Sequence, residues 1–365
     1  MSAFRELQPE ELELLATGAW ILGAGGGGSP YLGYLNLKRL YKEGHRAQIM
    51  QPEDLADDDM IAVVSNMGAP LVGQERLTDP AFATKPVAMM EEYLGRKFRA
   101  VMAVEIGGGN AIQPFQVACM TGLPVVDADA MGRAFPEAQM TSFAICDLQP
   151  FPLTLADIHD NGVVIPRAAS WKWMERLSRK ACVEVGSIAA TCKAPRTGKE
   201  VKDCGILHTV TQAIDIGRTV ATARKQHGDP INAVVDGHNG RVLFRGKVQD
   251  MERRATEGFL RGKAEFTGLD DFRGRTFSLD FQNEWLLGRL DGEVTVMVPD
   301  IVCVMDTISG EAIGTEVMRY GQRVTIIALP PPAILCEPRG LRYVGPRAFG
   351  YDVDFQSLFT TQEMG

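Results

Sequence analysis

Blocks of apolar and polar residues alternate along the first half of the chain, from Pro9 to about Arg167, and predict helices and strands in turn. The expected elements are a helix at 9–18, a short buried strand at 19–22, a helix at 30–44, a strand at 60–66, a helix at 86–95, a strand at 99–107, a helix at 111–122 and a strand at 123–129. Strands that alternate with helices at this spacing form βα units, whose parallel sheet is covered on both faces. The first half therefore predicts a three-layer α/β/α sandwich with a largely parallel sheet.

The pattern changes at about residue 168. Two helices are expected first, at 170–182 and 206–226. Short alternating runs separated by turns such as "DGHNG" and "LDGE" then predict strands at 231–237, 240–248, 277–281, 293–306 and 323–329. The chain is thus expected to divide into an α/β domain at 1–167 and a helical connection with a mainly-β domain at 168–365.

Composition narrows the class of protein. The formal net charge is −8, and the basic residues are scattered, which argues against nucleic acid or an anionic membrane as the main partner. No apolar run is long enough to span a bilayer, and the N-terminal stretch is charged and amphipathic, unlike a secretory signal. The seven cysteines include no CxxC pair, so we expect reduced core thiols in a cytoplasmic protein, without disulfides or a zinc knuckle.

A glycine-rich loop stands between the expected strand at 19–22 and the next helix. It places five glycines in six positions, followed by Ser29 and a proline that are expected to begin the helix. Gly23, Gly25 and Gly28 match the G-x-G-x-x-G pattern of dinucleotide-binding loops. That fold also needs an acidic residue about 20 positions later, and Glu53 lies beyond the expected strand end. NAD-dependent redox chemistry is therefore the weakest alternative.

The same glycines favour a loop that holds an oxygen atom. Glycine lets the backbone turn sharply, so the N–H groups of Gly25, Gly26, Gly27 and Gly28 can point at one phosphate, carboxylate or developing oxyanion. The alternative is close packing of the backbone against a neighbour. One or two glycines would satisfy packing, whereas five favour an anion-binding loop.

A second glycine loop repeats this arrangement at 104–111. Gly107, Gly108 and Gly109 follow an expected strand, and Asn110 is the expected N-cap of the next helix. Glu105 stands in the apolar strand just before the glycines, where a functional role is favoured over a surface role. Both loops are expected at the carboxyl ends of parallel strands, the edge where open α/β sheets bind ligands.

Acidic residues follow a third strand at the same expected edge. Asp127 and Asp129 are two positions apart, so alternation along the strand places them on one side of the sheet. Arg133 follows them, and Asn66 ends a further strand. Each acid alone would suit a helix cap or a surface turn, but two glycine loops and two carboxylates at one edge predict a binding site.

The motifs "GAGGGGSPYLG", "EIGGGNA", "VVDADAMGRAFPE", "TGKEVKD" and "VMRYGQRVTIIALPPP" together resemble the S-methyl thiohydantoin desulfurase family, a bacterial group long known only as a domain of unknown function. The resemblance extends from about residue 10 to residue 355. It implies an N-terminal α/β domain and a mainly-β C-terminal domain. Relatives that occur with hydantoinase- and oxoprolinase-like proteins imply small cyclic amide or amidine substrates and a partner of that kind.

The resemblance implies hydrolysis of an S-methylated thiohydantoin to a hydantoin, with release of methanethiol. That reaction needs a base to activate water, an acid, and donors for negative charge. Asp127, Asp129 and Glu105 are the candidate acid and base, with their individual roles open. The expected substrate-binding residues are Gly25, Gly26, Gly27, Gly28, Ser29, Asn66, Gly107, Gly108, Gly109, Asn110 and Arg133.

Several alternatives stay open beside this hydrolase. The chain could be a non-catalytic accessory subunit that binds a nucleotide or a carboxylate in a hydantoinase-type system. Cys119 and Cys204 lack a nucleophile turn and are expected as core thiols. Groups of Asp and His at 157–160 and 236–238 fall in turn-like sequence without HExxH spacing, so no cofactor is assigned and a divalent metal stays open. A homo-oligomer is also left open.

Overall fold

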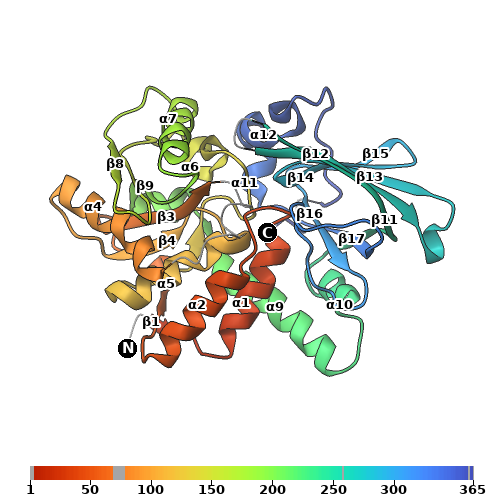
Figure 1. The fold of residues 1–365 in the computed structure, drawn as a ribbon, viewed down its shortest axis with the longest axis horizontal. Coiled ribbons are helices and arrows are strands. Elements are labelled where there is room, and N and C mark those ends of the chain that lie inside the picture. Colours follow the sequence, from red (N-terminus) through yellow and green to blue (C-terminus); the bar gives the residue numbers. More distant parts are fainter. Residues whose placement is uncertain (1–3, 69–78, 257–258, 361, 365) are drawn as a thin grey trace.

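Two β-sheets with helices around them make up the structure (Figure 1), a computed structural model that describes residues 4–68, 79–256, 259–360 and 362–364. The first sheet has eight strands, in the order β1 (Phe4–Glu6), β2 (Gln48–Met50), β5 (Val125–Val126), β4 (Ala100–Ala103), β3 (Met60–Gly68), β9 (Ile188–Thr197), β7 (Leu153–Ala156) and β8 (Gly162–Ile165). Strands β2, β5, β4 and β3 run parallel, and the outer pairs are antiparallel.

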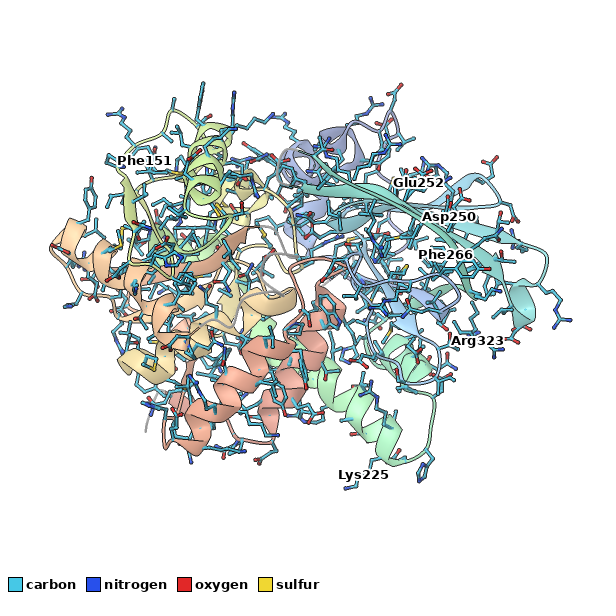
Figure 2. The ribbon with its side chains drawn as sticks, viewed as in Figure 1. Phe151, Lys225, Asp250, Glu252, Phe266 and Arg323 are labelled. Carbon is cyan, nitrogen blue, oxygen red and sulfur yellow. The ribbon has the colours of Figure 1, made fainter. Side chains whose placement is uncertain are left out.

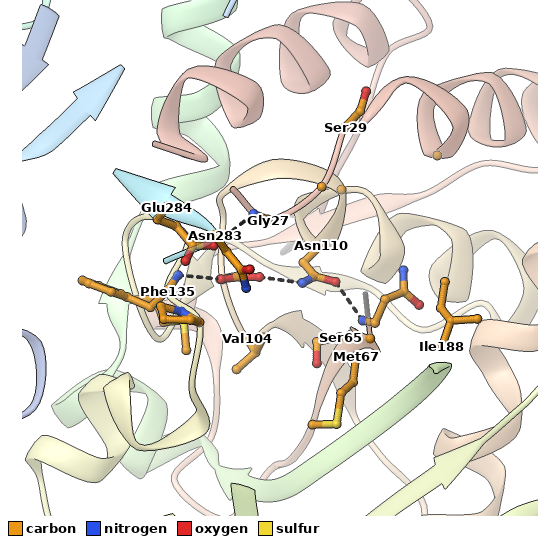
Figure 3. A pocket seen from close by; sticks show the side chains of 18 of the residues that line it. Gly27, Ser29, Ser65, Met67, Val104, Asn110, Phe135, Ile188, Asn283 and Glu284 are labelled. Atoms are coloured by element: carbon orange, nitrogen blue, oxygen red, sulfur yellow. Dashed lines mark hydrogen bonds between the residues drawn. The ribbon is translucent and has the colours of Figure 1, made fainter. Parts of the chain in front are cut away.

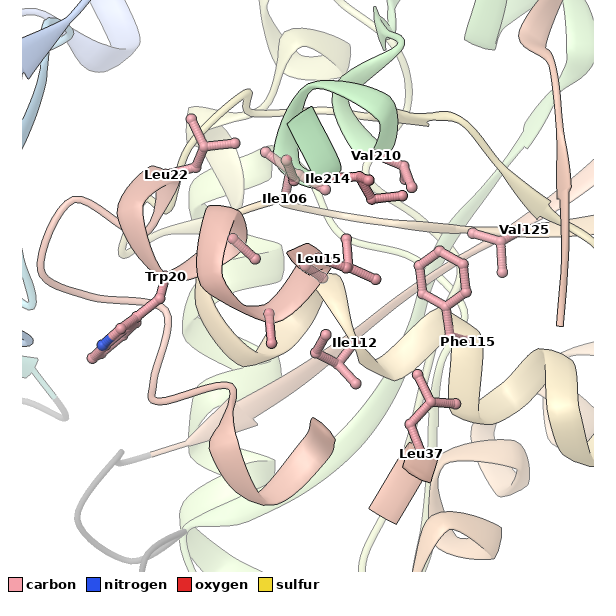
Figure 4. Close-up of a cluster of buried hydrophobic side chains, with 14 of the residues drawn as sticks. Leu15, Trp20, Leu22, Leu37, Ile106, Ile112, Phe115, Val125, Val210 and Ile214 are labelled. Atoms are coloured by element: carbon pink, nitrogen blue, oxygen red, sulfur yellow. The ribbon is translucent and has the colours of Figure 1, made fainter. Parts of the chain in front are cut away.

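Helices cover both faces of this sheet, because adjacent apolar residues of its strands point to opposite sides. Ile49 and Val125 pack with helices α1 (Glu11–Leu22), α2 (Tyr31–Lys42), α4 (Lys85–Leu94), α5 (Gln113–Thr121) and α9 (Thr209–Lys225), part of which Figure 4 shows. Met50 and Val126 pack with α6 (Ser142–Ile145), α8 (Gly198–Cys204), α11 (Ala333–Cys336) and α12 (Pro338–Val344). The predicted three-layer α/β/α class is confirmed.

The second sheet has seven antiparallel strands, in the order β15 (Glu293–Met297), β14 (Glu284–Leu290), β13 (Thr276–Gln282), β12 (Phe259–Gly268), β11 (Arg241–Thr256), β17 (Arg323–Leu329) and β16 (Ile301–Asp306). Its core holds large residues such as Phe266, whereas Asp250 and Glu252 of β11 are exposed (Figure 2). The mainly-β character expected after residue 168 is confirmed. No helix among the described residues has the length and apolar character of a membrane span.

Two predicted strands are helical. Residues 19–22 complete α1, which is buried on most sides, so no polar face marked its helical period. Residues 231–237 belong to α10 (Pro230–Gly237), whose first amide groups donate to the Asp229 side chain. An aspartate followed by proline is a signal for a helix start, and it outweighs the alternating pattern after it.

Other elements differ in extent. The expected strand at 99–107 contracts to β4, and the one at 123–129 divides into β5 and β6 (Ala128–Asp129), which pairs with β10 (Ile206–Leu207). Helix α7 (Trp171–Glu184) leads into β9, a strand that the sequence did not predict. Strand β9 joins the first sheet between β3 and β7, although it comes from the second half of the chain.

The first glycine loop, residues 23–28, is the seam between the two sheets. The Trp285 amide donates to the Ala24 carbonyl over 2.8 Å, and the Thr315 amide donates to the Gly25 carbonyl over 2.8 Å. A Cβ on Gly26 would lie 2.1 Å from the Glu284 Oε1 atom. A side chain at this position would displace the Glu284 carboxyl group.

The second glycine loop packs directly on the first. The Gly109 amide donates to the carbonyls of Gly27 and Gly28, over 3.1 and 2.9 Å. Gly108 has a φ of +69°, and a Cβ there would lie 2.6 Å from the Gly27 carbonyl. The two loops therefore meet as predicted, but the packing alternative accounts for most of their glycines.

Replacing Gly108 with alanine tests this packing. Gly122 offers a matched control, because its φ is +78° and open space surrounds its Cβ position. Gly122→Ala is expected to cost about 1 kcal/mol of unfolding free energy from backbone strain alone. Gly108→Ala is expected to cost about 2 kcal/mol more, because backbone atoms must move apart. Urea unfolding measures both, and equal losses would contradict the packing.

Candidate active site

A cavity of about 440 Å³ lies where the two sheets meet, at the carboxyl ends of β3 and β4 (Figure 3). The first glycine loop, the end of β3, the loop after β4 and strand β9 form its walls. Helix α7 and the turn between β13 and β14 complete it. Its polar lining residues are Ser29, Ser65, Asn66, Glu105, Asn110, Gln116, Glu137, Glu175, Arg179, Lys193, Asn283 and Glu284.

Glu105 is fixed in the wall by two donors. Its Oε1 atom accepts from Asn110 Nδ2 over 2.6 Å, and its Oε2 atom accepts from the Phe135 amide over 3.0 Å. Asn110 Oδ1 accepts in turn from the backbone N–H of Asn66 over 2.7 Å. Only 6% of Glu105 is exposed, and burial raises its pKa to about 7. Glu105 therefore changes ionisation near neutral pH.

Glu284 supplies a second carboxyl group from the other side of the seam. It begins β14, is 2% exposed, and accepts from the Gly27 amide through Oε1 over 3.2 Å. Its Oε2 atom has no hydrogen-bond partner among the described residues. Burial and the nearby Glu105 carboxylate raise the pKa of Glu284 well above its usual value. The protonated form, which can donate a hydrogen bond, is therefore favoured more than in an ordinary glutamate.

Two cations lie in the same wall. Arg179 Nε donates to Glu175 Oε1 over 2.5 Å, and Glu175 Oε2 accepts from the Ala138 amide over 3.0 Å. Lys193 comes from β9, and burial lowers the pKa of its ammonium group. The arginine charge is thus neutralised within the wall, whereas Lys193 lines the cavity without an ion pair among the described residues.

Exposed apolar side chains stand at the opening of the cavity, together with the exposed polar residues Ser29 and Asn66. Tyr31 and Leu32, in the first turn of α2, line it and are 61% and 37% exposed. Met67, Ile188 and Val317 also line the cavity. An enclosed polar floor with apolar side chains at its opening suits a small ring that carries an apolar substituent.

Seven of the sequence-predicted residues line the cavity: Gly27, Gly28, Ser29, Asn66, Glu105, Gly109 and Asn110. Asn110 was expected to be the N-cap of a helix, but the structure gives it a different role: its side chain donates to Glu105. Gly25, Gly26, Gly107 and Gly108 lie in the seam outside the lining. Ser29 is not the N-cap of α2 either, since Pro30 takes that position.

Asp127 lies outside the cavity lining. Its Oδ1 atom accepts from the amides of Val210 and Thr211, over 2.8 and 3.1 Å, and its Oδ2 atom accepts from Thr211 Oγ1 over 2.5 Å. The side chain is fully buried. Its contacts are those of a carboxylate that caps the N-terminus of α9, which corrects the expected placement at the cavity.

Asp129 also lies outside the lining. One carboxylate oxygen accepts from the amides of Ile106, Met131 and Gly132, over 2.8, 3.1 and 2.8 Å. Burial raises its pKa to about 7. Asp129 holds the backbone of Ile106, the residue next to Glu105, and so positions the loop that carries Glu105. Asp129 itself does not line the cavity.

Arg133, predicted to bind substrate, instead joins the two halves of the molecule. Its buried guanidinium donates to the carbonyls of Trp285, Pro299 and Asp300, over 3.2, 3.3 and 2.8 Å. It also lies 4.8 Å above the Phe135 ring. Its donors are taken up by the protein and do not reach the cavity.

The alternatives receive little support from the geometry. The first glycine loop follows helix α1, so the strand that the dinucleotide fingerprint requires is absent there.

Within the described ranges no three His, Cys, Asp or Glu side chains gather as a metal site. Burial raises the pKa of both Cys119 and Cys204 to about 12, and neither thiol lines the cavity. Asp157 accepts from two amides of its own turn.

Sequence reasoning missed several cavity residues, among them Asn283, Glu284 and Lys193. Asn283 is the turn between β13 and β14, and Glu284 begins β14, in a hairpin where polar residues are expected for turn chemistry alone. Lys193 carried a signal, because it stands within the apolar run "IAATCKAP". A lysine inside a buried strand is rare unless it has a role.

Two family models match almost the whole chain. The model described as "S-Me-THD-like, N-terminal domain" covers residues 10–167, and "S-Me-THD-like, C-terminal domain" covers residues 169–358. No curated protein matches the chain. A crystal structure of a protein from Chromobacterium violaceum is similar, with a TM-score of 0.80 and 22% identity over 96% of this chain and 99% of that chain. This likeness shows a shared fold.

Asp127→Ala tests whether this carboxylate is a structural cap. The change leaves buried donors of Val210 and Thr211 without an acceptor, so the unfolding free energy is expected to fall by about 2–4 kcal/mol. Asp229→Ala is the control, because that exposed cap of α10 should cost only about 1 kcal/mol. Urea unfolding distinguishes them. An unchanged stability for Asp127→Ala would contradict the capping role.

Glu284→Gln tests the raised pKa through stability. Between the ordinary pKa of 4.5 and the raised folded value, the folded protein keeps a proton that the unfolded chain releases, so stability falls as pH rises. The glutamine variant lacks this loss. Its melting temperature relative to the parent is expected to be higher at pH 8 than at pH 5. A difference that stays constant with pH would show that Glu284 ionises normally.

Proposed function

The chain belongs to the S-Me-THD-like family, and from the geometry of its cavity we propose that it hydrolyses small cyclic amidines of the S-methyl thiohydantoin kind. The observation that carries the proposal is the pair of buried carboxyl groups, Glu105 and Glu284, which line one cavity and differ in their hydrogen bonding. One is held by N–H donors and the other has a free oxygen. Such a pair supplies a base and an acid at the same pH.

Glu105 is the proposed base. Both of its oxygens accept from N–H groups, which favours the ionised form, and its pKa of about 7 makes it a competent base at neutral pH. In the proposed step Glu105 removes a proton from water. The water oxygen forms a bond to the ring carbon that carries the methylthio group.

Glu284 is the proposed acid. The carbon–sulfur bond breaks as the tetrahedral adduct collapses, and the sulfur takes the proton of Glu284 to leave as methanethiol. The ring retains the new oxygen and becomes a hydantoin. The proton on Glu105 then returns to Glu284 through solvent, so the enzyme and the atoms are balanced after each turnover.

Amide side chains would orient the ring. Asn283 Oδ1 accepts from the Leu260 amide over 2.8 Å, which leaves its NH₂ group to donate toward the cavity. The apolar side chains of Tyr31 and Leu32 at the opening would contact a substituent of the ring. Orientation by groups fixed in the walls lowers the entropic part of the barrier.

Thiol release from an S-methyl thiohydantoin tests the proposal. The parent should release methanethiol, and Glu105→Gln should lower kcat by about 10²-fold or more, because a general base is lost. The rate should rise through about pH 7 as Glu105 ionises, and the loss of the proton of Glu284, whose pKa is raised, should set a falling limb that Glu284→Gln alters. Glu252→Gln on the exposed face of β11 is the matched control and should keep full activity (Figure 2).

The outcomes separate the two functions considered. Absence of thiol release by the parent, with hydantoin still raising its melting temperature, would favour a non-catalytic binding subunit. Full activity in Glu105→Gln would place the chemistry elsewhere.

A further inference from the structure

Lys193 is a charged group of the cavity that the acid–base pair does not use. It lies in the middle of β9, opposite Val63 of the neighbouring strand β3, and its neighbours Cys192 and Ala194 are buried. Two flanking strands, β3 and β7, hold β9 in the sheet. The side chain lines the cavity from a rigid position, as a binding group must.

The ammonium group finds no acceptor in the part of the chain that the structure describes. There the Lys193 side chain makes neither a hydrogen bond nor an ion pair, whereas Arg179 is paired with Glu175. A partly buried ammonium group without an acceptor is costly, and a ligand that supplies an acceptor recovers this cost. The unmet requirement is therefore for a negatively charged or strongly polarised oxygen or nitrogen atom.

We propose that Lys193 binds the negative charge that develops on the substrate ring. The inference rests on the proposed function, and it names the class of ligand: a cyclic amide or imide in its anionic form. As water adds to the ring carbon, an electron pair moves onto the adjacent ring nitrogen and is shared with the neighbouring carbonyl oxygen. The ammonium group meets that charge, and the pair returns when the carbon–sulfur bond breaks.

Charged groups surround Lys193. Burial lowers the pKa of its ammonium group, with a smaller contribution from Arg179, whereas Glu175, Glu105 and Cys182 oppose this shift. Both glutamates lie in the same cavity wall. Their negative charges favour the ammonium form, in keeping with a group that acts by charge and does not attack carbon as an amine.

Lys193→Met tests the proposal, with Lys193→Arg as the variant that keeps the charge. Lys180→Met on the exposed side of α7 is the matched control. In the thiol-release assay Lys193→Met should lower kcat by about 10²-fold with little change in KM, and Lys193→Arg should recover part of the loss. Equal losses in both variants, or activity within threefold of the parent in Lys193→Met, would overturn the role of charge.

A binding experiment separates this inference from the proposed reaction. Barbiturate, a cyclic imide that is ionised at pH 7, should bind to the parent, and Lys193→Met should weaken its binding by about tenfold or more. Neutral hydantoin at the same pH should lose much less. If Lys193→Met loses barbiturate binding but the parent releases no thiol, the proposed reaction is contradicted and the anion site is supported. Equal barbiturate binding in the parent and Lys193→Met would contradict the anion site and leave the proposed reaction unaffected.

Discussion

The close contact of two glycine loops determines the rest of the site. The backbone at Gly27 lies against the backbone at Gly108 at a distance that admits no Cβ, and Gly26 lies against the Glu284 side chain. Glu105, which precedes the second loop, therefore lines the same cavity as Glu284 from the other sheet. Neither carboxyl group could take this position if the seam were wider. Gly27 and Gly108 thus set the separation of the two loops, while Gly27, Gly28 and Gly109 also line the cavity.

Electrostatics follow from this geometry. Two carboxyl groups that are withdrawn from water and placed near one another cannot both ionise easily, so the pKa values of both Glu105 and Glu284 are raised, and N–H donors hold Glu105. Asp129 anchors the loop that carries Glu105, and Arg133 binds the carbonyls of the second half. These buried polar contacts are costly unless every partner is present, and they keep the acid and base in fixed places.

Much of this arrangement could be predicted from the sequence. Alternating patterns indicated the two classes of domain, and the glycine loops with Glu105 indicated the cavity. The placement of Asp127 at this cavity was wrong, because a carboxylate that accepts from helix amides and one that faces a substrate have the same pattern. Glu284 could not be found, since its partner Gly27 is 257 positions away and only the folded chain joins them. The prediction of a strand at 19–22 was wrong, because these residues end a helix that is buried on most sides and has no polar face to reveal its period.

A crystal structure of the Glu105→Gln variant with a bound S-methyl thiohydantoin tests the central claim most directly. The account predicts that the ring lies in the cavity, with the methylthio carbon between residue 105 and Glu284 and the ring carbonyl near the Lys193 ammonium group. A ring bound beside Asp127, or at any surface away from the seam, would contradict it.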